Sequence, residues 1–144
     1  MYTATKEFNF EAGHCLDGHK GKCKNLHGHN YKVFVTLKSQ NLDNMDMVMD
    51  FYDLKKFADP LFDKFDHAFL YNSTCIDGFE TEIFNVCHNH NRKTFSLPMR
   101  FTAENMAKYF YDELKSHNDK VYEVTVYETP TSYATYKEGI ENAD

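Results

Sequence analysis

Histidines are concentrated near the start of the chain, where four of the eight lie between residues 14 and 29. Two of them form the pair His27-Gly28-His29. If His29 opens a strand, residues two apart point to the same face, so both imidazoles can reach one ion at about 2.0–2.1 Å. His14, at the end of a preceding strand, can supply a third nitrogen across an antiparallel pair. Three nitrogen ligands with an open fourth position are typical of catalytic zinc, whereas structural zinc has four protein ligands.

Cys23 lies four residues before His27 and has two interpretations. In the first it is a fourth ligand, which makes a structural zinc site of one cysteine and three histidines. In the second it is a free thiol beside the metal, where nearby positive charge favours the thiolate and makes it usable as a general base. The spacing alone does not decide between the two.

The strands that must position these side chains follow from the pattern of apolar residues. Residues 2–12 contain β-formers and aromatics and end at Gly13. Asn30 to Lys38 alternates, with Tyr31, Val33, Val35 and Leu37 on one side and polar residues on the other. We expect two strands here, joined by a loop over residues 15–26.

Two amphipathic helices are predicted further along the chain. Asp53 is the predicted N-cap of the first, whose apolar stripe is Leu54, Phe57, Ala58, Leu61, Phe62 and Phe65. The second has Thr102 as its N-cap, with Phe101 and Met106 placed for a hydrophobic staple. Its stripe continues through Tyr109, Phe110 and Leu114, and the helix should end near His117.

The chain closes with a predicted hairpin, because Val121 to Tyr127 and Ser132 to Tyr136 are rich in β-formers and flank a Thr-Pro-Thr turn. The order strand, strand, helix, helix, strand, strand predicts an α+β fold with an antiparallel sheet. The segment from Thr74 to Arg100 has the weakest pattern. We expect it to be mostly loop, with a short strand over Phe95 to Leu97.

Composition limits the classes of function. A chain of 144 residues fits a single domain, 1–144, with its own core. The net charge of -6 and a pI near 5.7 argue against a nucleic-acid-binding protein, which needs a broad basic face. No apolar run reaches membrane-spanning length and no leader pattern opens the chain, so we expect a cytoplasmic protein with no membrane partner and reduced cysteines. Its densest basic patch is Lys20, Lys22 and Lys24.

Several motifs together resemble one known family. The string Cys23-Lys24-Asn25-Leu26-His27-Gly28-His29-Asn30-Tyr31, preceded by Phe10-Glu11-Ala12-Gly13-His14, resembles the 6-pyruvoyltetrahydropterin synthase and 6-carboxytetrahydropterin synthase family. Downstream, Asp66-His67, Thr102-Ala103-Glu104-Asn105 and Glu128-Thr129 resemble further motifs of that family, in the same order. The resemblance covers about residues 6 to 137.

The resemblance implies a fold and an assembly. The fold of the family, the tunnelling fold, is a four-stranded antiparallel sheet with two helices on one face. Its trimers close a twelve-stranded barrel, and two trimers usually stack into a hexamer with sites between subunits. We therefore expect a homo-oligomer, a trimer or hexamer, in which Thr74 to Arg100 is a longer variable segment than in compact relatives.

The resemblance also implies roles for individual residues. His14, His27 and His29 would bind Zn²⁺, and Cys23 would take a proton from the substrate in a relay with Asp66 and His67. Glu128 and Thr129 would anchor the pterin ring, and Lys24 with its neighbouring lysines would neutralise a triphosphate. Without the resemblance, Asp66 and Glu128 would be ordinary capping or exposed charges, and His67 a satisfied polar residue.

The activity implied first is that of 6-carboxytetrahydropterin synthase. This zinc lyase converts 7,8-dihydroneopterin triphosphate to 6-carboxytetrahydropterin, with release of acetaldehyde and triphosphate, on the path to queuosine. The three residues between Cys23 and His27 favour it over 6-pyruvoyltetrahydropterin synthase, which tends to have a longer gap. A non-catalytic zinc-binding protein is a third alternative.

Two features depart from the family pattern or add to it. Cys15 follows His14 where many bacterial relatives carry a basic residue, and Phe101 stands where proline is frequent. Cys87-His88-Asn89-His90 resembles a second metal site, but a His-x-His in a loop without other ligands is more often solvated surface, which is our expectation here.

Overall fold

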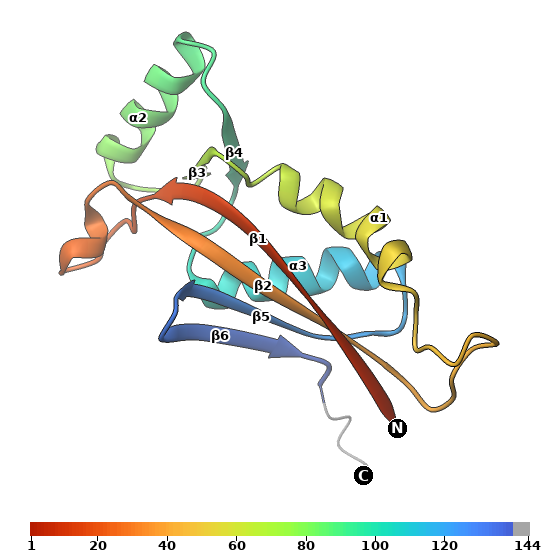
Figure 1. The fold of residues 1–144 in the computed structure, drawn as a ribbon. Coiled ribbons are helices and arrows are strands. Elements are labelled where there is room, and N and C mark those ends of the chain that lie inside the picture. The colour runs from red at the N-terminus through yellow and green to blue at the C-terminus, as the bar shows by residue number, and fades with distance from the viewer. Residues whose placement is uncertain (140–144) are drawn as a thin grey trace.

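A computed structural model describes residues 1–139, and these form a six-stranded sheet in the order β4-β3-β1-β2-β5-β6 (Figure 1). The last five residues of the predicted 1–144 domain lie outside the described part. The strands are β1 (Tyr2–His14), β2 (His27–Ser39), β3 (Ala68–Asn72), β4 (Thr94–Leu97), β5 (Val121–Thr129) and β6 (Ser132–Lys137). The helices are α1 (Phe51–Asp63), α2 (Gly78–Asn89) and α3 (Ala103–His117), with a 3₁₀ turn at Lys22–Lys24.

The α+β class is confirmed, but the predicted four strands and two helices are too few for the described residues. β1, β2, β5 and β6 are the expected antiparallel strands. β3 runs parallel to β1, and β4 runs parallel to β3. Together with α2 they form a strand-helix-strand unit, of which α2 and β4 lie within the segment from Thr74 to Arg100 that was predicted to be mostly loop. The short strand predicted over Phe95 to Leu97 is confirmed as part of β4.

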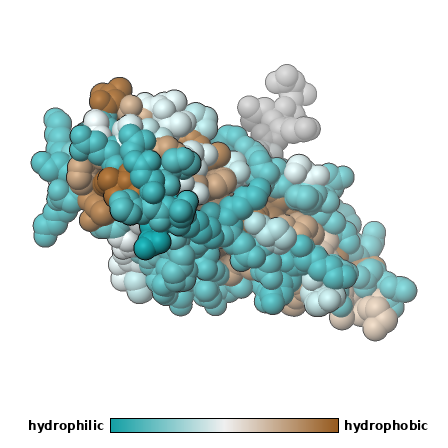
Figure 2. All heavy atoms as spheres, turned by 90° about the horizontal axis from the view of Figure 1, so that it is seen from above, coloured by the Kyte–Doolittle hydropathy of each residue, from teal (hydrophilic) through white to brown (hydrophobic). Residues whose placement is uncertain are grey.

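The missed helix α2 has no stripe of core residues to reveal it. Among its twelve residues only Glu80 is buried, while Phe79 and Val86 are exposed. Its N-cap is Asp77, whose side chain accepts a hydrogen bond from the Phe79 backbone N–H. Figure 2 shows hydrophobic atoms gathered at the end of the molecule that carries α2.

The register of β1 against β2 positions both the core and the histidines. Phe10 lies opposite Tyr31 and His14 lies opposite His27. The alternating side chains of β2 that were predicted to share a face are all buried: Tyr31, Val33, Val35 and Leu37. Both strands are longer than predicted, so His14, His27 and His29 belong to the ladder and not to the loop.

Helices α1 and α3 cover this face of the sheet (Figure 1). Phe62 of α1 meets Phe110 of α3 with ring centroids 5.0 Å apart, and Phe10 of β1 lies 5.9 Å from Phe110. Burial of aromatic rings of this size supplies much of the hydrophobic stabilisation of a small domain. No helix in the described part of the chain has the length and apolar character needed to cross a membrane.

The two helix starts were predicted with different success. Thr102 is confirmed as the N-cap of α3, since its side chain accepts from the Asn105 backbone N–H at 3.1 Å. The prediction of Asp53 as the N-cap of α1 is wrong. Asp50 is the cap and accepts from the Tyr52 N–H at 2.8 Å, whereas Asp53 lies in the first turn, where a negative charge favours the helix dipole.

Candidate active site

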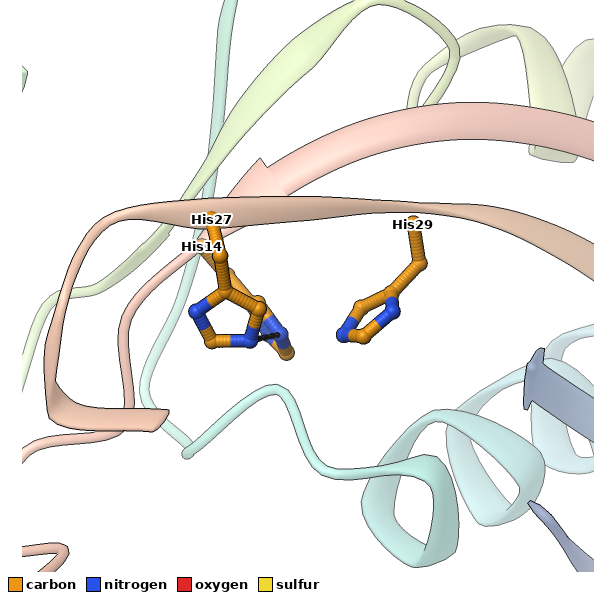
Figure 3. A group of neighbouring side chains, drawn as sticks. All are labelled: His14, His27 and His29. Atoms are coloured by element: carbon orange, nitrogen blue, oxygen red, sulfur yellow. Dashed lines mark hydrogen bonds between the residues drawn. The ribbon is translucent and has the colours of Figure 1, made fainter. Parts of the chain in front are cut away.

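His14, His27 and His29 project from β1 and β2 toward the segment that precedes α3 (Figure 3). One ligand nitrogen from each lies within 4.8 Å of the others. The Nε2 atoms of His14 and His27 are 3.0 Å apart. His14 was predicted to lie across the antiparallel pair from the other two histidines. The structure places it there, because His14 and His27 are register partners.

Backbone carbonyls fix the orientation of two of these rings. His14 Nδ1 donates to the Phe101 carbonyl at 2.9 Å, and His27 Nδ1 donates to the Asn25 carbonyl at 2.7 Å. Because a carbonyl only accepts, each Nδ1 carries the hydrogen and each Nε2 presents a lone pair. The two lone pairs then face each other without a proton between them.

This donor set fits a zinc ion. Two ligands of one tetrahedral ion, each about 2.0–2.1 Å from it, lie roughly 3.3–3.4 Å apart, which is close to the separation of the two Nε2 atoms. Carbonyl partners on Nδ1 are the usual outer contacts of metal-binding histidines. In the described residues the group contains these three histidines and does not include Cys23. The geometry thus resembles a three-nitrogen centre with an open position.

The electrostatics favour the neutral imidazole at His14 and His29, which is the form that binds a metal. Burial, with the neighbouring charges of His27 and His29, lowers the pKa of His14 to about 4. Burial also lowers the pKa of His29, and His27 adds to this effect. His14 is only 1% exposed, so its ring has little access to water.

Tyr31 is a site residue that the sequence analysis assigned only to the core. It follows His29 on the same face of β2, and its hydroxyl lies 3.4 Å from His14 Nε2. Burial, and then the negative charge of Glu128, raises the pKa of the phenol well above its usual range. The two-residue alternation His27, His29, Tyr31 was the pattern that could have placed it here.

Glu128, near the end of β5, lies in the same region as the histidines. Burial raises the pKa of its carboxyl group, and the charge of Glu104 adds to this, while His27 and a hydrogen bond from the Ala103 backbone act in the opposite direction. Thr129 is half-buried beside it, and its hydroxyl accepts from the Thr131 N–H at 3.3 Å. A half-buried carboxylate beside a metal site can accept hydrogen bonds from a ligand that carries several N–H groups.

Cys23 and Lys24 lie in the 3₁₀ turn of the loop between β1 and β2. Cys23 is half-buried and Lys24 is exposed. The Cys23 carbonyl accepts a hydrogen bond from the Leu16 N–H at 2.8 Å, which closes the loop on itself.

Asp66 and His67 form a pair just before β3. His67 Nδ1 lies 3.0 Å from Asp66 Oδ1, and the same oxygen accepts from the Glu11 N–H at 3.0 Å. That backbone N–H, with His67, lowers the pKa of Asp66. The His67 backbone is left-handed, with φ of 58°, and its N–H donates to the Glu11 carbonyl at 2.6 Å. The carboxylate is thus placed to orient the imidazole.

The described residues do not join this Asp-His pair to Cys23 by a hydrogen bond. His67 lines a pocket of about 700 Å³ together with His27, His29 and the α2 residues Ile83 and Cys87. Glu128 is thus near enough to His27 for the charge of that ring to act on its pKa, and His67 shares a pocket with two of the three histidines. Cys87, His88 and His90, at the end of α2, form no group of possible metal ligands in the described part of the chain.

Comparisons with known proteins agree on one family. A family model described as 6-pyruvoyl tetrahydropterin synthase matches residues 3–139. The chain is 40% identical over 144 aligned residues to the 6-carboxy-5,6,7,8-tetrahydropterin synthase of Haemophilus influenzae, covering 96% of this chain and 100% of that protein. It is 36% identical to the Aquifex aeolicus protein of the same name, with 93% and 96% covered.

Among solved structures, the fold is similar to the 6-pyruvoyl tetrahydropterin synthase of Caenorhabditis elegans. The TM-score is 0.72 at 30% sequence identity, and 96% of each chain is covered. The relatives match almost the whole chain, and the segment with α2 is spanned by the alignments and not left outside them.

The buried histidine predicts how the stability of the metal-free protein depends on pH. Since the pKa of His14 is about 4 in the folded state and about 6.5 when unfolded, only the unfolded state takes up this proton as the pH falls from 6.5 toward 4. The free energy of unfolding should therefore decrease over this window, by on the order of 3 kcal/mol from this group. Urea unfolding at several pH values, with a chelator present, measures the change.

Two variants separate His14 from the other histidines in this measurement. His14→Gln cannot titrate, so its free energy of unfolding should fall less steeply over the same window. His90→Gln, which removes an exposed histidine, is the matched control variant. Equal slopes in wild type and His14→Gln would contradict the assignment.

Proposed function

Since the chain belongs to the 6-pyruvoyl tetrahydropterin synthase family, we infer that it is an enzyme of the 6-carboxytetrahydropterin synthase type, a lyase of queuosine biosynthesis. The observation that carries this inference is the 40% identity to the Haemophilus influenzae protein of that name across 96% of the chain. The reaction converts 7,8-dihydroneopterin triphosphate to 6-carboxytetrahydropterin and releases acetaldehyde and triphosphate.

A pyruvoyl-forming activity is the second candidate. It is favoured by the similarity to the Caenorhabditis elegans structure, at 30% identity. The sequence identity to the carboxy enzymes is higher, and it ranks the carboxy product first. The non-catalytic alternative required Cys23 as a fourth metal ligand, and the described metal-ligand group does not include it.

The metal in this proposal is zinc, held by Nε2 of His14, Nε2 of His27 and a ring nitrogen of His29. When bound, it supplies Lewis acidity that favours loss of protons from the hydroxylated side chain of the substrate. Phe101 and Asn25 hold two of the rings through their carbonyls and so keep the ligand nitrogens directed at one point.

Cys23 is the proposed proton acceptor. It lies in the loop that joins the two strands bearing the histidines, and it is half-buried, so a substrate can reach it. His67, oriented by Asp66, is the proposed partner that keeps the thiol ionised. Because no hydrogen bond links Cys23 to His67 in the described residues, we propose that the relay forms between Cys23 of one subunit and the Asp-His pair of another.

Glu128 and Thr129 are the proposed anchors of the pterin. A pterin ring offers an N–H and an amino group side by side, and the two oxygens of Glu128 can accept from both. Those hydrogen bonds would favour the charged form of a carboxylate whose pKa burial now raises. Lys24, exposed in the loop beside Cys23, is the proposed contact for the triphosphate.

The sheet edges support a homo-oligomer. β3 pairs with β1 only at Ala12 and Gly13, so the β1 edge from residue 2 to residue 11 has no strand partner in the described chain. β6 is the other edge of the sheet. Next to the free part of β1 lies a hollow of about 530 Å³ lined by Leu42, Met47 and Phe51. Unpaired edges flanked by apolar side chains favour association, and we propose a trimer or hexamer.

Product analysis tests the proposed reaction. Zinc-loaded protein incubated anaerobically with dihydroneopterin triphosphate should release acetaldehyde in proportion to triphosphate, with a 6-carboxy pterin as the ring product. Aldehyde trapping and mass spectrometry of the pterin measure both. Triphosphate release without acetaldehyde, together with a pyruvoyl pterin, would assign the second activity. The absence of turnover at full zinc occupancy would count against both.

Replacement of Cys23 tests its role against that of a metal ligand. Cys23→Ala should keep one zinc per chain, because three imidazoles remain, and should lose about 10²–10⁴-fold in kcat because the proton acceptor is gone. Zinc content and rate are measured on the same preparation. Cys87→Ala, a half-buried cysteine of α2 outside the histidine group, is the matched control. Loss of zinc from Cys23→Ala would show that the thiol is a ligand.

The oligomer proposal predicts a mass well above that of one chain, 16.9 kDa, in light scattering at micromolar concentration. Thr5→Pro, within the free β1 edge, should weaken association, since proline removes a backbone donor that a partner strand needs. On its other side β1 is paired with β2, where Thr5 lies opposite Thr36. Ser39→Pro, at the end of β2, is a control for the general effect of proline in a strand. A monomer at all concentrations would contradict the proposal.

A further inference from the structure

The loop of residues 15–26, which carries Cys23, is tied to distant parts of the described chain through one residue. Most of its hydrogen bonds are internal, such as Leu16 N–H to the Cys23 carbonyl and Asn25 N–H to the Lys22 carbonyl. Two others reach outside the loop and its flanking strands, and both end on Asp17. Its carboxylate accepts from the Ile76 N–H at 2.9 Å, and its carbonyl accepts from Arg100 Nε at 2.9 Å.

Arg100 is itself held from several sides. Its carbonyl accepts from the Asn105 side-chain amide at 2.9 Å, in the first turn of α3. Its guanidinium lies over Gly18, where an added Cβ would be 3.4 Å from Nη2. Gly18 also has φ of 79°, so glycine suits the backbone conformation at this position. The charge of Arg100 opposes the effect of burial on the pKa of Glu80, which places the two near each other.

Glu80 supplies a reason for an arginine at this place. It is only 2% exposed, and one of its carboxylate oxygens accepts from the Asn72 N–H at 2.9 Å. The other oxygen has no hydrogen-bond partner in the described residues. Burial of a carboxylate costs free energy unless a cation is near. Glu80 therefore favours a guanidinium held close to it.

Arg100 is linked both to Cys23 and to the histidine group of the site. Asp17 is covalently next to Leu16, whose N–H holds the Cys23 carbonyl at 2.8 Å. On the other side, Arg100 is covalently next to Phe101, whose carbonyl holds the His14 ring at 2.9 Å. Two adjacent residues therefore hold the thiol loop and the first imidazole of the metal group.

We propose that Arg100 is a positioning residue that sets the place of Cys23 relative to His14. It donates to the loop backbone through Nε and acts on the reaction through Cys23. The consequence for turnover rests on the proposed function, while the consequence for the loop does not. A displacement of a reacting group by about 1 Å can cost about 10²-fold in rate, so one lost anchor is enough to matter.

The test compares zinc-loaded wild type with Arg100→Ala and Arg100→Lys. Arg100→Ala should keep one zinc per chain and a KM close to wild type, and should lose about 10–100-fold in kcat. Guanidinium ion added at millimolar concentration should restore part of the lost kcat of Arg100→Ala. Arg100→Lys keeps the charge beside Glu80 and should lose less. Lys108→Ala, which removes an exposed positive charge from α3, should match wild type.

A second readout does not depend on activity. Alkylation of Cys23, followed by mass spectrometry of its peptide, should be several-fold faster in Arg100→Ala, with the Cys87 peptide as internal reference. If Arg100→Ala fails to fold, the same measurements on Arg100→Lys decide. Wild-type kcat and wild-type alkylation in the variants would overturn the proposal, as would a raised KM with unchanged kcat, which means substrate contact. An inactive wild type with faster Cys23 alkylation in the variants would refute the proposed function and leave the positioning role supported.

Discussion

The pairing register of β1 with β2 is the constraint on which the rest of the site depends. With His14 opposite His27, one face of the two strands carries the aromatic core at one end and three imidazoles at the other. A shift by one residue would turn every one of these side chains to the opposite face. The stacked pair Phe10 and Tyr31, with ring centroids 4.9 Å apart, ties the register to the core, so that packing of the hydrophobic residues also aligns the three histidines.

The segment that enters α3 provides the second half of the site. Phe101 orients His14, Ala103 contributes a backbone hydrogen bond to Glu128, and Arg100 reaches the loop of residues 15–26. Residues 100 to 103 make all of these contacts, although their partners lie on β1, on β5 and in the loop. The N-cap of α3 fixes this short stretch, which therefore holds the site residues that it contacts in place.

The sequence was informative where local pattern and tertiary role coincide. The His-x-His spacing, the alternation of β2 and the Thr102 cap each depend on neighbours in the chain, and each is present in the structure. β3 was missed because its Ala68, Phe69 and Leu70 are all buried and show no alternation. α2 was missed because none of its apolar residues is fully buried and its one buried residue is the charged Glu80, so it has no apolar stripe. The contacts of Arg100 and Phe101 join residues more than eighty positions apart, which no local pattern encodes.

The left-handed backbone at His67 limits what can replace it during evolution. A side chain with φ near 58° is tolerated mainly for Gly, Asn, Asp and His, and other residues lose about 1–2 kcal/mol there. The codons for His are one base change from those for Asn and Asp. Single mutations at this position can therefore give either of two residues that preserve the fold. A lineage that lost the proposed proton relay but kept the sheet is expected to carry one of these residues, and rarely a β-branched one, beside its Asp66.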